Sequence, residues 1–193
     1  MVGRPKEFER DEVLARARDV FWAKGYDGAS LDDLTAAMGI GRASLYNEFG
    51  DKHSLFIEAL DCYRRERLAQ ISEVLNTASS ARAGIAAAFR GTVKELWADE
   101  GRRGCLLVNS TAELAASDPA VASRAAEGFE RMAGVFRSAL ERGKRSGELD
   151  ASLNVRATAR HLANTLNGLR LLAKVADKRV ADDVVEVALK ALD

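Results

Sequence analysis

Residues 42–49, RASLYNEF, bring side chains that can contact nucleic acid onto one short predicted helix. Leu45 and Phe49 stand at i, i+4 spacing, so we expect both to point toward a core. A guanidinium, a hydroxyl, a phenol and an amide then remain on the outer face, and these groups suit phosphate oxygens and base edges. The side chains expected to point outward are Arg42, Ser44, Tyr46 and Asn47.

A second predicted helix, at residues 31–38, precedes this segment and is expected to brace it. Ser30 can cap that helix, with Asp33 three residues on completing a capping-box pattern. Its apolar side consists of Leu34, Ala37 and Met38. Residues 39–41, Gly-Ile-Gly, then turn the chain, because glycine tolerates backbone angles that other residues avoid. Many small helical domains contain a helix, a glycine turn and a helix, so this pattern alone does not establish DNA binding.

The wider sequence resembles the TetR-type transcriptional regulators over about the first 60 residues. The matching segments, in chain order, are AKGYDGAS, LDDLTAAMGI, RASLYNEF and GDKHSLF. The resemblance implies a helix-turn-helix DNA-binding head and a helical body that binds a small molecule and forms a two-fold dimer. The chain departs from the family pattern at Thr35 and at Glu48, where a carboxylate beside the groove would repel phosphate.

The resemblance also implies roles for single residues. We expect Arg42, Ala43 and Asn47 to contact base edges of a palindromic operator, Ala43 through a thymine methyl group. The residues expected to hold phosphates are Ser30, Ser44, Tyr46 and Lys52, with Arg4 and Lys6 as contacts from the tail. The resemblance further implies that the bound dimer represses transcription and that a small molecule releases it from the operator. Activation is the alternative that the family allows.

Composition places the chain among ordinary globular proteins: of 193 residues, 47% are hydrophobic and 30% charged. No apolar run is long enough to span a membrane and the start lacks the apolar segment of a signal peptide, so a cytoplasmic protein is expected. Basic and acidic side chains balance at 29 each, and residues 1–50 hold more acidic than basic ones. Nonspecific DNA binding should therefore be weak.

Hydrophobic periodicity predicts an all-α chain of about nine helices. A small helix-turn-helix domain is expected at residues 1–50 and a larger helical domain for effector binding and dimerisation at residues 51–193. The predicted helices cover approximately residues 10–24, 31–38, 42–49, 51–75, 81–98, 105–116, 118–145, 154–176 and 180–192.

The last two predicted helices carry stripes of apolar and small residues. The stripes are Ala159, Leu162, Ala163, Leu166 and Leu169 on one helix, and Val180, Val184, Val187, Ala188 and Ala191 on the other. Two such helices from each subunit would form a four-helix interface of a homodimer. The alternative is that both stripes pack inside one chain.

An effector pocket is expected among the middle helices of the body. It would be mainly apolar with a few hydrogen-bonding groups, which suits an apolar or aromatic small molecule. The candidate lining residues are Phe89, Trp97, Cys105, Asn109, Phe129, Met132, Phe136, His161 and Asn164. Aromatic residues at helical spacing equally suit a plain core. His161 has no second ligand at metal-binding spacing, so neither a metal nor another cofactor is expected.

Cys105 opens a predicted helix directly after Arg102-Arg103-Gly104. A helix N-terminus and nearby guanidinium groups favour the thiolate, the reactive form of cysteine. The segment GCLLVN also resembles a TetR-type branch that includes sensors of electrophiles and oxidants. Cys105 is therefore an alternative sensor, with Lys174 as its partner. The sequence favours the simpler interpretation that Cys105 is a small buried hydrophobic residue at a helix start.

Two other classes of function fit the sequence less well. An enzyme is not expected, because GIG and GRRG lack the length of a phosphate-binding loop and no nucleophile and base stand at a credible spacing. A helical adaptor would need an apolar outer face on residues 42–49, where polar side chains stand instead. The sequence therefore favours a DNA-binding regulator.

Overall fold

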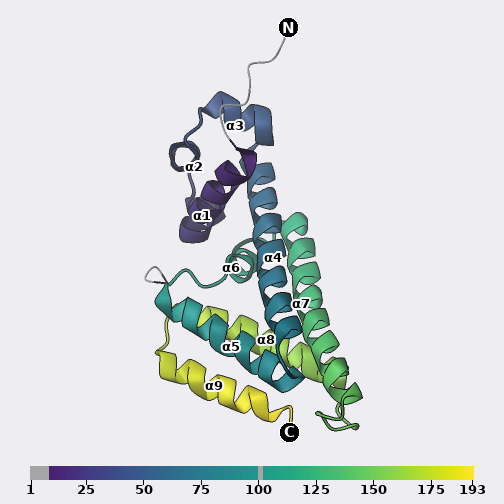
Figure 1. Ribbon diagram of the computed structural model, residues 1–193. Coiled ribbons are helices and arrows are strands. Elements are labelled where there is room, and N and C mark those ends of the chain that lie inside the picture. The colour runs from purple at the N-terminus through teal and green to yellow at the C-terminus, as the bar shows by residue number, and fades with distance from the viewer. Residues whose placement is uncertain (1–8, 100–101) are drawn as a thin grey trace. The chain divides into compact units, whose positions relative to one another are not determined.

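The structure, a computed structural model, describes residues 9–99 and 102–193. All regular structure in this part of the chain is helical (Figure 1). The helices are α1 (Arg10–Gly28), α2 (Leu31–Met38), α3 (Arg42–Phe49), α4 (Lys52–Thr77), α5 (Ala81–Ala98), α6 (Leu106–Leu114), α7 (Pro119–Arg145), α8 (Val155–Leu172) and α9 (Lys178–Lys190). The all-α prediction is confirmed.

The chain forms two compact units, residues 1–63 and residues 64–193. The two units divide inside α4, so the first part of this helix belongs with the N-terminal helices. The boundary predicted from the sequence lies earlier, after residue 50. Arg4 and Lys6, predicted to contact DNA from the tail, lie outside the described residues.

The N-terminal unit is built on an apolar face of α1. Val13, Leu14, Ala17 and Phe21 are buried there, and the Phe21 ring meets the ring of Phe56 edge to face at 5.1 Å between centroids. Aromatic pairs in this geometry add stability beyond the apolar area that they bury. Helix α2 packs against α1 and contributes buried Leu34 and Met38. This packing provides the support on which α3 is held.

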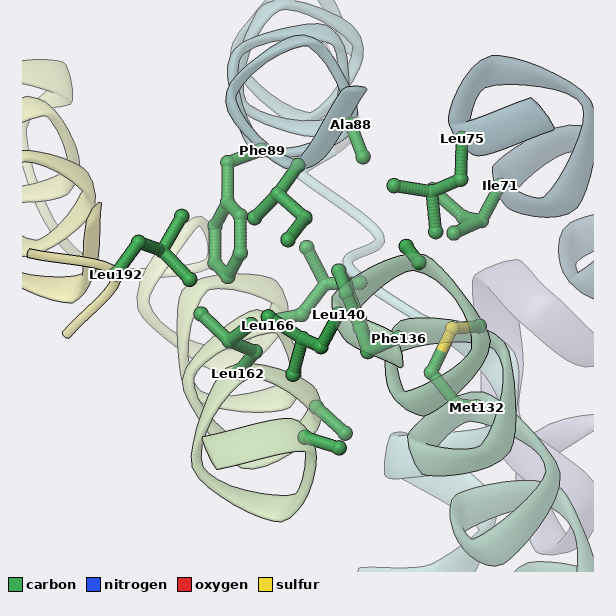
Figure 2. Packing of buried hydrophobic residues seen from close by; sticks show 14 of the residues in the cluster. Ile71, Leu75, Ala88, Phe89, Met132, Phe136, Leu140, Leu162, Leu166 and Leu192 are labelled. Carbon is green, nitrogen blue, oxygen red and sulfur yellow. The ribbon is translucent and has the colours of Figure 1, made fainter. Parts of the chain in front are cut away.

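The second unit is held by one apolar cluster to which α4, α5, α7, α8 and α9 contribute. Figure 2 shows its centre, where Phe89 of α5 faces Leu192 and the α8 leucines Leu162 and Leu166, and Phe136 of α7 lies beside Leu140. The Phe89 and Phe136 rings are 5.9 Å apart between centroids. These closely packed side chains therefore stabilise the fold of the second unit.

Capping side chains fix where the body helices start. Asp118 accepts the N–H groups of Ala120 and Val121 at 2.9 and 3.2 Å, ahead of a proline in the first turn of α7. Glu148, beyond the end of α7, accepts the N–H groups of Ala81 and Arg82 at 2.8 and 2.7 Å, so it ties that segment to the start of α5.

The stripe predicted to form the dimer interface on α8 lies inside the chain. Ala159, Leu162, Ala163, Leu166 and Leu169 are all at most 4% exposed and belong to the apolar cluster. The prediction that these residues face a second subunit was therefore wrong, because α5, α7 and α9 cover them. Between residues 9–99 and 102–193, no helix is both long enough and apolar enough to cross a bilayer.

Candidate nucleic-acid interface

Helix α3 presents one buried and one exposed face. Leu45 and Phe49 are buried, as predicted, with 0% and 4% of their surface exposed. On the other face Arg42, Ala43, Tyr46 and Asn47 are exposed, and Ser44 is half-buried. Tyr46 is 45% exposed and is one of five exposed large hydrophobic side chains in the described part of the chain. This arrangement is what the predicted DNA contacts require, although the contacts themselves stay a prediction.

Backbone geometry explains how the turn presents α3. Gly39 ends α2 in the left-handed conformation, at φ 69°, and its N–H donates to the Thr35 carbonyl at 3.0 Å. Gly41 precedes α3 as its N-cap residue. Ile40 between the two glycines is half-buried. The turn therefore follows from glycine at the position where φ is positive.

Arg42, the foremost candidate for base contact, is bound to a neighbouring carboxylate. Its Nη2 donates to Oδ1 of Asp32, in the first turn of α2, at 2.6 Å. Asp32 raises the pKa of Arg42 through this bond. Both side chains are exposed, so the bond is weak in net terms and can be exchanged for another acceptor. DNA would compete with Asp32 for this guanidinium.

Ser30, predicted to hold a phosphate, forms the capping box of α2. Its Oγ accepts the Asp33 N–H at 3.0 Å and donates to Asp33 Oδ2 at 2.7 Å, and its own N–H donates to the same oxygen at 3.1 Å. Lys24 donates to Asp33 Oδ1 at 2.6 Å, and this bond together with those from Ser30 lowers the pKa of Asp33 to about 2. Both donors of Ser30 are therefore engaged in the cap.

Two further residues beside α3 are paired. Glu48, whose carboxylate was expected to repel phosphate, accepts a hydrogen bond from Arg10 Nε at 2.8 Å. Lys52, predicted to bind phosphate, has its Nζ 4.5 Å from the centre of the Tyr26 ring. A lysine over an aromatic ring retains its charge and can still face an anion.

Sequence reasoning missed Arg10 and Asp32 as residues that set the charge around α3. Their partners lie 38 and 10 positions away in the chain. No short-range spacing rule connects such distant residues, whereas the i, i+3 capping of α2 was visible in the sequence.

The residues predicted to line an effector pocket are divided between the apolar core and the surface. Phe89, Met132 and Phe136 are core residues at most 6% exposed. Trp97 packs against that core and donates from Nε1 to the Ala176 carbonyl at 3.2 Å, and Phe129 is half-buried. His161 and Asn164 lie on the exposed side of α8. These two therefore cannot orient a ligand inside the body of a single chain.

Cys105 and Asn109 do lie near one another, at the start of α6. Cys105 is buried and is the N-cap residue of the helix, but no side chain accepts the N–H groups of the first turn. Asn109 donates to the Arg103 carbonyl at 2.8 Å and accepts from Lys174 Nζ at 3.3 Å. Asn109 thus connects the segment before α6 to the residues after α8.

Two surface grooves in residues 64–193 are lined by other residues. One, of about 710 Å³, lies between α5 and α9 and includes Arg90, Lys94 and Val185. The other, of about 580 Å³, lies between α4 and α7 and includes Leu68 and Gly134. Neither contains a predicted pocket residue. In the described ranges, His, Cys, Asp and Glu form no group of three or more that could hold a metal ion.

Comparison with known proteins gives the same assignment for both units. The family described as bacterial regulatory proteins, tetR family, matches residues 13–59, and the one described as tetracyclin repressor-like, C-terminal domain, matches residues 81–189. The chain is 36% identical to the uncharacterized HTH-type transcriptional regulator YezE of Bacillus subtilis (strain 168), over 100% of both proteins.

Two further relatives have more informative names. The HTH-type transcriptional repressor ComR of Escherichia coli (strain K12) is 27% identical over 89% of this chain and 82% of its own. A cysteine-substituted form of the TetR family regulator CifR, solved with a 26-base-pair operator, is 39% identical over 98% of this chain and 100% of its own, with a TM-score of 0.88. The chain therefore belongs to the tetR family of bacterial transcriptional regulators.

Proposed function

We propose that the protein is a repressor that binds a palindromic operator as a homodimer and leaves it when a small molecule binds the body. The observation that carries the proposal is the outer face of α3, where Arg42, Tyr46 and Asn47 are exposed over a buried Leu45 and Phe49. In support, ComR is named a repressor and CifR was solved on operator DNA.

We assign base contacts to Arg42, Ala43 and Asn47. A guanidinium suits guanine, an amide suits adenine, and the Ala43 methyl suits the thymine methyl group. Phosphate contacts fall to three residues, Ser44, Tyr46 and Lys52, which fix the position of α3 without reading sequence. Ser30 would have to release Asp33 in order to donate to phosphate, so we assign it to the helix cap.

For the dimer interface we propose the outer side of α8 and α9 in place of the buried stripe. Apart from Tyr46, the large hydrophobic side chains exposed in the described chain lie on these helices or in the turn between them: Leu171, Val175, Val180 and Val187, at 44% to 80% exposure. Large exposed apolar side chains on two helices that pack together support a protein interface there. His161 and Asn164 share the exposed side of α8.

Sedimentation equilibrium of the full chain tests this interface. Val187→Asp together with Leu171→Asp is expected to give a monomer, because charges would be buried in an apolar contact. Ala69→Asp, an exposed alanine on α4, is the matched control and should leave a dimer. A dimer in both variants would place the interface elsewhere.

Operator binding is tested by stoichiometric titration of a labelled palindrome. Two chains per site are expected, with recognition helices about 34–36 Å apart or a multiple of that spacing. One chain per site at saturation would contradict the dimer. We propose that α4, which contributes residues to both units, carries the effect of the ligand, with a coupling of about 1–3 kcal/mol.

A second candidate is a sensor of electrophiles or oxidants that acts through Cys105. In its favour, Cys105 stands at the uncapped start of α6, and the side chain of Lys174 lies against the adjacent Gly104. Because Cys105 is only 2% exposed, a reagent would need a local opening to reach it. The test is alkylation with N-ethylmaleimide of Cys62→Ser, which retains only Cys105. Unchanged operator affinity after complete alkylation would exclude this sensor, and Cys105→Ser should resist the reagent's effect.

A further inference from the structure

Arg170 of α8 is a buried cation that has no anionic partner among the described residues. The residue is 7% exposed, and within the described chain its one hydrogen bond runs from Nη1 to Oδ1 of Asn167, at 3.2 Å. It forms no ion pair with a carboxylate of residues 9–99 or 102–193. Other arginines that are well covered, such as Arg64 with Glu127 at 2.7 Å, do have one.

This arrangement is unfavourable for a purely structural residue. A guanidinium is always charged and carries five N–H donors, and the single neutral amide of Asn167 serves one of them. Burial of a charge is costly unless a counter-charge and further hydrogen bonds accompany it. A buried polar group whose bonding capacity is left over therefore calls for a partner that is bound separately.

The unused donors of Arg170 remain within reach of a ligand. Each side-chain nitrogen of Arg170 is either hydrogen-bonded or in contact with solvent. The nitrogens without a hydrogen-bond partner are therefore accessible to solvent. A guanidinium in that position can bind an oxyanion through two parallel hydrogen bonds.

The backbone of Arg170 lies beside a segment that carries positive charge. A Cβ added to Gly104 would lie 2.7 Å from the backbone carbonyl oxygen of Arg170. The same Cβ would lie 3.3 Å from the side chain of Lys174, four residues after Arg170. Gly104 leads into the uncapped N-terminus of α6, the positive end of that helix dipole. The nearest described carboxylate along this segment, Asp99, is already bound by Arg103 at 3.3 Å. Among the described residues of this segment, no carboxylate pairs with Arg170.

We propose that Arg170 binds the anionic group of the effector, and that the effector is a small organic carboxylate. This inference rests on the proposed function, in that it names the chemical class of the molecule that the body binds. It adds a negative charge to the apolar or aromatic effector that the sequence predicted. The planar fork of the guanidinium selects a planar carboxylate over a neutral amide of the same shape.

The test uses the full chain without DNA. Thermal unfolding and calorimetric titration are measured with sodium formate and sodium benzoate, each against its amide, formamide or benzamide, at constant ionic strength. The carboxylates should raise the unfolding temperature of the natural chain and the amides should not. Arg170→Met should bind the carboxylates about tenfold more weakly or worse, since it removes charge-assisted hydrogen bonds. Arg170→Lys should fall between the two.

Arg156→Met is the matched control, because it is the same substitution at an exposed arginine of the same helix. It should respond to carboxylates like the natural chain. Without ligand, Arg170→Met should unfold at the natural temperature or above it, because a buried unpaired charge has been removed. A clear loss of stability in Arg170→Met, or carboxylate binding that is absent or equal in both proteins, would overturn the proposal.

The two proposals fail separately. A chain that binds carboxylates through Arg170 but never binds an operator would overturn the proposed repressor and leave this site intact. A chain that binds its operator and shows no preference for carboxylate over amide would overturn only the assignment of Arg170.

Discussion

Arg10 and Glu48 form an ion pair, 2.8 Å from Nε to Oε1, that joins α1 to α3. Arg10 Nη2 also donates to Glu58 of α4 at 2.6 Å, and its guanidinium carbon lies 4.9 Å from the centre of the Phe49 ring. The bonds to Glu58 and Glu48 raise the pKa of Arg10. The carboxylate that seemed unsuited to a DNA-binding helix is thus balanced by a cation and helps to hold that helix.

Arg10→Ala should weaken both the fold and DNA binding. Loss of two ion pairs is expected to lower the free energy of unfolding by about 1 kcal/mol, a small value because the Arg10 side chain is 37% exposed and solvent screens it. Glu48 would then lose its ion pair with Arg10 beside α3. Urea unfolding and operator titration measure the two effects. Arg16→Ala, which removes only an exposed contact to Glu12 at 3.7 Å, should change neither; equal losses would contradict the account.

Asp32→Asn should tighten operator binding. The Asp32 carboxylate holds Arg42 at 2.6 Å and would stand near the phosphates, so its removal frees the guanidinium and reduces repulsion. Because both side chains are exposed, the gain should be modest, about two- to fivefold at low salt, and should shrink as salt rises. Fluorescence anisotropy with labelled operator measures it. Glu141→Gln, which removes one negative charge at an exposed residue of α7, provides the control, and weaker binding by Asp32→Asn would refute the proposed competition.

The capping box of α2 should make stability depend on pH in acid. Folding lowers the pKa of Asp33 from 3.8 to about 2, chiefly through Lys24 and then Ser30. The charged form is favoured in the folded state, so the stabilisation is complete above about pH 4 and is lost as the pH falls toward about 2. The difference in unfolding temperature between the natural chain and Asp33→Asn should shrink across this window. A constant difference in unfolding temperature between about pH 4 and about pH 2 would contradict this role of Asp33, and Asp11→Asn serves as the control.

Local patterns predicted much of this fold from the sequence. The bounds of α3 and α5 follow from i, i+4 spacing and from the residues at their ends, and Gly39 occupies the left-handed position that the turn requires. The α8 stripe was assigned correctly to one helical face but to the wrong partner. Periodicity shows which face is apolar, and it does not show whether that face meets the same chain or another.

The site was less accessible to sequence reasoning. The outer face of α3 follows from its period, but the pairing of Arg42 with Asp32 and of Glu48 with Arg10 depends on how helices pack. His161 and Asn164 were placed in a pocket because they are polar residues on an apolar helix, and the structure exposes both. Arg170 attracted no attention in the sequence, since one arginine near a helix end is usually solvated.

Two glycines of α7 should respond to alanine in opposite directions. A Cβ on Gly143 would lie 2.7 Å from Leu149 Cδ1 and 2.8 Å from Ala81 Cβ, whereas Gly134 has nothing within 4 Å. Gly143→Ala should therefore cost about 1–3 kcal/mol through overpacking. Gly134→Ala should add up to about 1 kcal/mol, since alanine favours the helix. Urea unfolding of the two variants measures both changes. Stabilisation by Gly143→Ala would show that the packing around Gly143 adjusts freely, and destabilisation by Gly134→Ala would contradict the second expectation.

Footprinting at physiological salt, on DNA upstream of the protein's own gene and its neighbours, tests the central claim most directly. The account predicts protection of a palindrome by the natural chain, with Arg42→Ala losing affinity for that site far more than for scrambled DNA. Lys52→Ala should weaken binding to both DNAs alike. Equal losses from the two variants on both DNAs, or a footprint that does not depend on Arg42, would contradict α3 as the helix that reads the operator.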